Sequence, residues 1–160
     1  MVSRRKAREV VLRALYVSEC RNIHVSEVFT EMEAIDSEIA ASGDDEEAQQ
    51  LRHFSCGLDT KQKEFALSLA GKIIENTDVL NSYLVPVLKN WDFNRVSRID
   101  RIIMWIALAE MLYMLDIPMT VSINEAIELA KKYSSEKSPG FVNGVLDSAS
   151  QNLRMDVNSQ

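Results

Sequence analysis

Apolar residues recur every three or four positions along almost the whole chain. The pattern is clear in "EFALSLAGKII" and "INEAIELAKKY", where one side of a helix would be apolar and the other polar. No stretch alternates between apolar and polar residues as a half-buried strand would, and glycine (5) and proline (3) are scarce among the 160 residues. The sequence therefore predicts an all-α fold.

Residues that commonly begin helices divide this pattern into segments. The predicted starts are Ser3, Ser26, the pair Asp59 and Gln62, Thr77, the pair Ser97 and Asp100, and Ser138 before Pro139. Pro86 would end or kink the helix that begins at Thr77. The helix from Ile99 to about Leu115 is apolar on nearly all sides, so other helices must cover it. We expect a single compact bundle of about seven or eight helices, one domain over residues 1–160.

Charge is distributed unevenly along the chain. The net charge is -6 overall, but residues 1–21 carry +4 and residues 22–50 carry -9. Within the acidic part, "ASGDDEEAQQ" combines a glycine with four successive acidic residues, which is typical of a solvated loop that leads into a short helix. Residues 36–50 are therefore predicted to form an acidic loop or a short-helix insertion.

Length and composition limit the class of protein. At 160 residues and 46% hydrophobic, the chain can bury a core without metal ions or disulfides. Cys20 and Cys56 are too few for a disulfide framework, and the N-terminus lacks the apolar segment of a signal peptide. The longest apolar stretch, Ile102 to Leu115, has 14 residues and contains Glu110, whereas a membrane span needs about 20. These features predict a cytoplasmic protein.

Four cations open the chain: Arg4, Arg5, Lys6 and Arg8, here called the basic arm. Cations at a helix N-terminus oppose the helix dipole, so fold stability does not call for them there. An arginine-rich segment can bind phosphate oxygens in bidentate fashion, with binding that weakens as salt rises. The alternative is a frayed, solvated tail whose charge only aids solubility.

Four longer stretches point to a known family. They are "RRKAREVVLRALY", "NWDFNRVSRIDRIIMWIALAEM", "IPMTVSINEAIELAKKY" and "FVNGVLD", distributed over most of the chain. Together they resemble the NusB family of bacterial transcription antitermination factors. The resemblance implies an all-helical fold, a cytoplasmic location and no catalysis. It also implies binding of boxA RNA jointly with NusE, a small-subunit ribosomal protein, so that RNA polymerase resists termination.

The resemblance assigns RNA contacts to residues at both ends of the chain. They are Arg4, Arg5, Lys6, Arg8 and Tyr16 near the start, and Tyr133, Phe141 and Asn143 near the end. Arginines would bind phosphates, aromatics would stack on bases and an amide would read a base edge. Core packing is the alternative for Tyr16 and Phe141, and a surface position for Tyr133 and Asn143. For the NusE face we expect Trp91, Asp92 and Arg95.

Two features depart from the family pattern. Trp105 stands where many relatives carry arginine, and the acidic stretch from about Asp36 to Gln50 is longer than expected. That stretch would repel phosphate or occupy the basic arm within the molecule. One alternative function is therefore a non-catalytic protein-interaction or homodimerisation module that does not bind RNA itself. Another is an accessory domain of RNA modification, since NusB-like domains also occur attached to RNA cytosine methyltransferases.

Enzymatic and metal chemistry have little support. Cys20 with His24 and His53 with Cys56 could together supply four zinc ligands, but their separation fits no zinc-finger spacing. Glu110 interrupts an apolar helix and is expected to find a hydrogen-bond partner inside the protein, rather than to transfer protons. The sequence contains no Walker A, G-x-G-x-x-G, G-x-S-x-G or H-E-x-x-H motif. We expect neither a cofactor nor catalysis.

Overall fold

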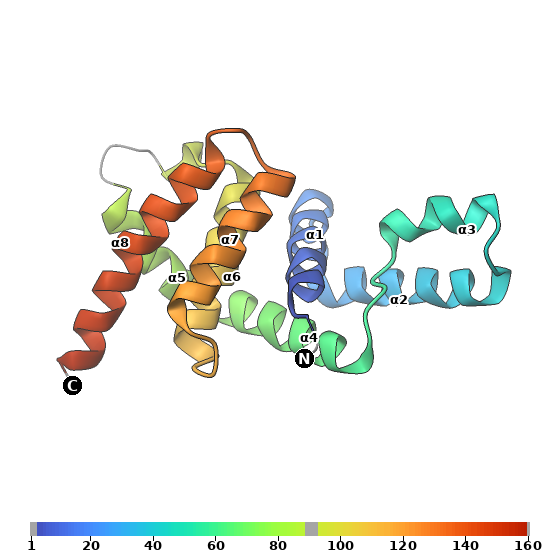
Figure 1. The fold of residues 1–160 in the computed structure, drawn as a ribbon, viewed down its shortest axis with the longest axis horizontal. Coiled ribbons are helices and arrows are strands. Elements are labelled where there is room, and N and C mark those ends of the chain that lie inside the picture. Colours follow the sequence, from blue (N-terminus) through green and yellow to red (C-terminus); the bar gives the residue numbers. More distant parts are fainter. Residues whose placement is uncertain (1–2, 89–92, 160) are drawn as a thin grey trace. The chain divides into compact units, whose positions relative to one another are not determined.

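The computed structural model describes residues 3–88 and 93–159, and within these ranges it contains helices and no strand (Figure 1). The α-helices are α1 (Arg5–Arg21), α2 (Val25–Ser42), α3 (Glu46–Leu51), α4 (Thr60–Glu75), α5 (Thr77–Leu84), α6 (Arg98–Tyr113), α7 (Met119–Tyr133) and α8 (Ser138–Asn158). Three short 3₁₀ helices, η1 (Arg52–Phe54), η2 (Val85–Val87) and η3 (Phe93–Arg95), connect them. The prediction of an all-α fold with seven or eight helices is confirmed.

The chain divides into two compact units, Met1–Leu67 and Ser68–Gln160, and the division falls within α4. The assignment of residues 1–160 to a single domain remains a prediction.

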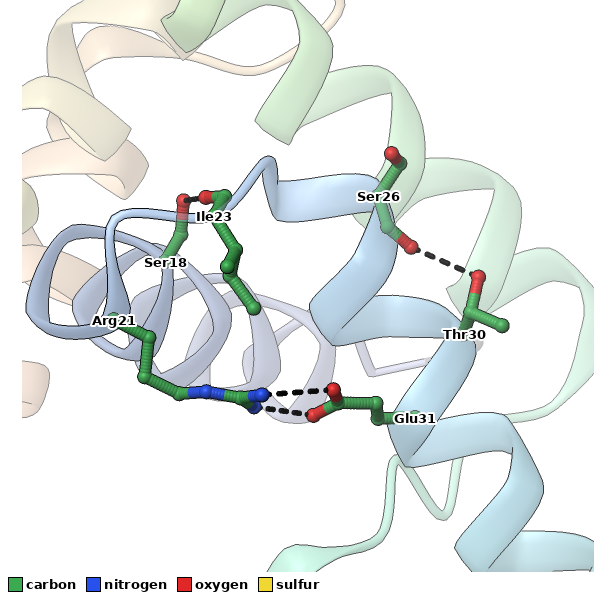
Figure 2. A network of polar contacts seen from close by, with 6 residues as sticks. All are labelled: Ser18, Arg21, Ile23, Ser26, Thr30 and Glu31. Carbon is green, nitrogen blue, oxygen red and sulfur yellow. Dashed lines mark hydrogen bonds and ion pairs between the residues drawn. The ribbon is translucent and has the colours of Figure 1, made fainter.

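A tight corner joins α1 to α2 in the first unit. Asn22 ends α1 in the left-handed conformation (φ 52°), and the Ser18 hydroxyl donates to the Ile23 carbonyl oxygen at 2.6 Å. Across the corner, both Nη atoms of Arg21, at the end of α1, donate to the carboxylate of Glu31 in α2, at 2.5 and 3.0 Å (Figure 2). This hydrogen-bonded pair raises the pKa of Arg21 and lowers the pKa of Glu31. It links the C-terminus of α1 to α2.

The predicted acidic insertion is partly helix. α2 continues to Ser42, Gly43 turns the chain at φ 82°, and Asp45 caps α3 by accepting from the Ala48 amide at 2.8 Å. The cap predicted for α2 is wrong, because His24 precedes the helix and its Nδ1 accepts from the Ser26 amide at 3.2 Å. Ser26 itself lies in the first turn.

In the second unit α6 is the central helix, and it packs against α5, α7 and α8. Eleven of its residues are buried, from Asp100 to Met111. α7 and α8 lie side by side along it (Figure 1). Trp105 is only 7% exposed and its indole nitrogen donates to the Asn81 side chain at 2.8 Å, so the core accommodates this departure from the family pattern.

The remaining predicted helix starts vary in accuracy. Asp59 and Gln62 form the expected reciprocal capping box, and Ser97 accepts from the Asp100 amide at 3.1 Å. The caps predicted at Thr77 and Ser138 are wrong by one residue: Asn76 and Lys137 occupy those positions. The Thr77 hydroxyl instead donates to the Ile73 carbonyl oxygen, within the preceding turn. α5 ends at Leu84, and Pro86 lies in η2, so the predicted break is confirmed.

Candidate nucleic-acid interface

The basic arm forms the start of α1. Arg4 is the N-cap residue, its side chain makes no cap hydrogen bond, and no acidic residue lies in the first turn. Arg4, Arg5 and Lys6 are exposed, whereas Arg8 is only 5% exposed. Three of the four predicted phosphate ligands therefore lie on the surface at the start of α1, and the fourth, Arg8, is buried.

One aromatic ring organises two of these cations. The guanidinium carbon of Arg4 lies 4.8 Å from the centre of the Phe65 ring, and that of Arg8 lies 5.5 Å away. Phe65 comes from the first half of α4 and is half-buried. The sequence placed it among core residues, and only the four-residue spacing of the two arginines hinted that they share a face.

Lys6 turns to a different neighbourhood. A methyl group added at Gly57 would lie 3.1 Å from the Lys6 Nζ, so the two residues are close. Both line a cavity of about 340 Å³ within the first unit, together with Arg13, Asp36, Ile39, Arg52, Ser55 and Cys56. Arg13 donates to the carbonyl oxygens of His53 and Ser55, at 2.7 and 3.1 Å. These bonds fix the segment that follows η1 beside the basic arm.

Acidic side chains of the predicted insertion have partners close to them. Asp36 accepts from the Gly57 amide at 3.1 Å, and Asp44 pairs with Arg52. Asp45 caps α3. These three carboxylates therefore stabilise the α2–α3 hairpin and the segment after it.

Tyr16 lies two turns after Arg8 on α1 and is 40% exposed. Its predicted alternative was core packing, in which a tyrosine would be largely covered. Its 40% exposure does not fit that core-packing alternative.

The second predicted region is in the second unit, at the junction of α7 and α8. Tyr133 is the last residue of α7 and Phe141 lies in the first turn of α8, and both are half-buried. Asn143 follows on α8 and is exposed. The structure thus places these three residues on the adjoining ends of two packed helices.

A buried polar network holds that junction. Asp100, in the first turn of α6, is 7% exposed and accepts hydrogen bonds from Ser134 at 2.6 Å and Ser138 at 2.9 Å. Ser135 lies 2.8 Å from Ser138, oxygen to oxygen. Sequence reasoning assigned Asp100 and Ser138 to helix caps and found no link between them, since 38 positions separate the two.

The predicted NusE face is described only in part. Trp91 and Asp92 lie outside the described residues. Arg95 ends η3 and is exposed.

The residues considered for metal binding and proton transfer have other surroundings in the structure. Cys20 is exposed and Cys56 is buried, and in residues 3–88 and 93–159 no three His, Cys, Asp or Glu side chains form a group that could hold a metal ion. The alternative zinc site is therefore not formed. Glu110 is fully buried and accepts from the Ser122 hydroxyl at 3.0 Å, which confirms the expected internal partner. None of the helices in the described part of the chain has the length and apolar character needed to cross a membrane.

Comparisons with known proteins identify the family and agree with the fold. The NusB family model matches residues 5–151. The transcription antitermination protein NusB of Chloroherpeton thalassium is 37% identical over 147 residues, which cover 92% of this chain and 61% of that protein. The solved NusB of T. maritima is 32% identical, covers 94% of this chain and 92% of its own, and superposes with a TM-score of 0.72. A complex of the antitermination factors NusB and NusE with double-stranded RNA shares the fold at 19% identity, with a TM-score of 0.69 over 93% of this chain and 96% of that one.

Proposed function

The chain belongs to the NusB family, and on that premise we propose that it is a transcription antitermination factor that binds boxA-type RNA of ribosomal RNA leader transcripts together with NusE. It acts without catalysis, in the cytoplasm, and makes RNA polymerase resist termination. The fold that it shares with a NusB–NusE complex containing double-stranded RNA supports this choice of partners.

One observation carries the proposal: exposed cations at the start of an ordered helix. Arg4, Arg5 and Lys6 lie where the helix dipole disfavours positive charge, by about 0.3 to 1 kcal/mol for each exposed cation. A polyanion bound there offsets that cost, because guanidinium groups form charge-assisted hydrogen bonds with phosphate oxygens and counterions are released. Arg8 is buried and adds its positive charge to the same end of α1. Like Arg4, it makes a cation–π contact with the Phe65 ring.

Recognition of bases falls to the aromatic and amide side chains. Tyr16 in the first unit stacks on an unpaired base, as do Tyr133 and Phe141 in the second. Asn143 is exposed on α8 and can both donate to and accept from a base edge. In this proposal the protein recognises the RNA sequence through unstacked bases of a single strand, and not through the groove of a duplex.

NusE binds a separate face in this proposal. Arg95 is exposed at the end of η3 and is the described member of the set Trp91, Asp92 and Arg95. Protein contacts there add to an RNA site that is weak by itself.

The test is a titration of labelled boxA RNA with and without NusE at several salt concentrations. For single-stranded RNA the slope of log affinity against log salt should be about -0.7 for each phosphate neutralised. Arg5→Glu should weaken binding and make the slope shallower. Arg154→Glu is the matched control, because Arg154 is an exposed arginine near the end of α8 and the substitution changes net charge equally.

Two results would contradict the proposal. One is an absence of RNA binding both with and without NusE; the other is binding that does not respond to salt. Either would favour a module that only binds protein. Equal effects of Arg5→Glu and Arg154→Glu would show that net charge acts and the basic arm does not.

A further inference from the structure

The Asp100 carboxylate joins three helix ends in the second unit. Its two oxygens accept from different hydroxyls: Oδ1 from Ser134, which follows α7, and Oδ2 from Ser138, the first residue of α8. Asp100 itself belongs to the first turn of α6. The separation of its two oxygens therefore sets where the end of α7 and the start of α8 lie relative to α6.

Further hydrogen bonds close the network within the α7–α8 link. The Ser138 hydroxyl oxygen accepts from the Ser135 hydroxyl at 2.8 Å, because its own proton is donated to Asp100. The Ser134 oxygen, whose proton is also donated to Asp100, lies 2.9 Å from the Ser138 oxygen. The Ser138 amide donates to the Ser135 carbonyl oxygen at 3.0 Å. The hydroxyls of the link thus bond to a buried carboxylate, and its backbone bonds to itself. Both kinds of bond restrict the conformation of the link.

Burying a carboxylate is unfavourable unless hydrogen bonds and local dipoles compensate. Here the negative charge lies at the N-terminal turns of both α6 and α8, where the helix dipoles favour it. The 2.6 Å bond from Ser134 has the length of a charge-assisted O–H···O⁻ contact. Such bonds are strongly directional, so the network supplies geometry as well as stability.

The hydrogen-bond network of Asp100 lies next to the residues that are assigned to RNA binding. Tyr133 directly precedes Ser134, and Phe141 lies three residues after Ser138 on the same helix. Asn143 follows two residues later. We propose that Asp100, through Ser134 and Ser138, is a positioning residue that fixes the spacing of Tyr133, Phe141 and Asn143 for RNA. This inference rests on the proposed RNA-binding function.

The test compares two serines of α8. Ser138→Ala removes one bond to Asp100, while Ser150→Ala is the matched control, because Ser150 is 2% exposed and its hydroxyl donates only within its own helix, to the Asp147 carbonyl oxygen at 2.8 Å. We expect Ser138→Ala to weaken boxA RNA binding about tenfold and Ser150→Ala to leave it unchanged. The salt slope should stay the same in both, because the basic arm is untouched. Ser138→Thr keeps the hydroxyl and should restore affinity.

A double-mutant cycle separates positioning from simple stability. If the network positions Asn143, Ser138→Ala and Asn143→Ala together should weaken binding less than the product of their separate effects. Ser150→Ala and Asn143→Ala should multiply without coupling. Hydrogen exchange of the 134–138 amides should accelerate in Ser138→Ala. Asp100→Asn and Ser134→Ala, which keep the helix starts intact, repeat the measurement if Ser138→Ala folds poorly.

The outcomes distinguish this inference from the function on which it rests. If Asn143→Ala weakens RNA binding but Ser138→Ala and Asp100→Asn do not, the positioning role is wrong and the RNA site stands. If the losses track a fall in melting temperature and show no coupling with Asn143, the network is structural only. If the unaltered protein binds no RNA, or tolerates both Tyr133→Ala and Asn143→Ala, the network has nothing to position and the inference fails.

Discussion

Arg4 and Phe65 form a cation–π pair, with the guanidinium carbon 4.8 Å from the ring centre, although 61 positions separate the two residues in the chain. Arg8 approaches the same ring at 5.5 Å. Two arginines four residues apart on a helix repel each other, and the negative face of an aromatic ring reduces that repulsion. Phe65 therefore allows a helix to begin with closely spaced positive charge.

Removing this ring should weaken both the fold and the RNA site. Phe65→Leu keeps an apolar side chain but loses the cation–π contacts, which are worth about 0.5 to 2 kcal/mol each depending on burial. We expect the free energy of unfolding to fall by about 1 to 2 kcal/mol and boxA RNA affinity to fall several-fold. Urea denaturation and RNA titration measure the two effects.

Phe54→Leu is the control for this substitution. Phe54 lies in η1, is 64% exposed, and belongs to the same unit. Its replacement should leave stability and RNA affinity close to those of the unaltered protein. Equal effects at both positions would mean that the contact with the arginines is not what matters at Phe65.

Sequence reasoning succeeded where the determining contacts are local. The Asp59–Gln62 box was predicted because both hydrogen bonds join residues three apart. Pro86 was predicted to break its helix because proline lacks an amide hydrogen. Cap positions at Thr77 and Ser138 were wrong by one residue, because their hydroxyls bond elsewhere, to Ile73 in the preceding turn and to Asp100 on another helix.

The candidate site was predictable only in part for the same reason. The charge pattern indicated the basic arm, and family resemblance pointed to Tyr133 and Asn143, because both signals are contiguous in sequence. Phe65 was assigned to the core, since its spacing to Leu69 is that of any amphipathic helix. Nothing in the local pattern connects Phe65 to Arg4. Contacts between distant segments depend on how the helices pack, which periodicity alone does not determine.

The two cysteines should differ sharply in reactivity. Burial, and next the carboxylates of Asp36 and Glu33, raise the pKa of Cys56 to about 11. At pH 8 about one Cys56 thiol in a thousand is then ionised, and the thiolate is the reactive form. Cys20 is exposed. Maleimide labelling followed by mass spectrometry should show one rapid modification, at Cys20, and a second only in denaturant.

The raised pKa of Cys56 also predicts a pH dependence of stability. In the unfolded chain this thiol ionises near its usual pKa of about 8.5, so above that pH the unfolded state binds fewer protons than the folded state. The free energy of unfolding should therefore decrease as pH rises from about 8.5 towards 11. Cys56→Ser should flatten that part of the curve, and an identical decline in both proteins would contradict the assignment.

Ser122 should be important for stability because of its contact with Glu110. Glu110 is fully buried and Ser122 is 2% exposed, so water cannot replace the 3.0 Å hydrogen bond between them. Leaving a buried acceptor without this donor costs about 1 to 3 kcal/mol. Ser122→Ala should lower the free energy of unfolding by that amount. The exposed Ser148→Ala provides the comparison, and a loss below about 0.5 kcal/mol at Ser122 would show that Glu110 does not depend on this hydroxyl.

Gly144 makes the fold less stable than alanine at the same position would. It lies inside α8, where glycine is about 0.5 to 1 kcal/mol less favourable than alanine, and a methyl group added there meets no atom within 4 Å. Gly144→Ala should therefore raise the melting temperature. Gly57→Ala should lower it, because Gly57 has φ 57° and a methyl group there lies 3.1 Å from the Lys6 Nζ.

The same substitution tests whether a ligand approaches α8 closely. Gly144 directly follows Asn143, which is assigned to RNA in the proposed function, and no neighbouring atom obstructs a methyl group at position 144. Gly144→Ala should then weaken boxA RNA binding even though it stabilises the fold, a combination that lost packing cannot produce. Gly140→Ala, one turn earlier and equally unobstructed, shows how far along the helix the contact extends. Unchanged affinity in a stabilised Gly144→Ala protein would mean that RNA does not reach this turn.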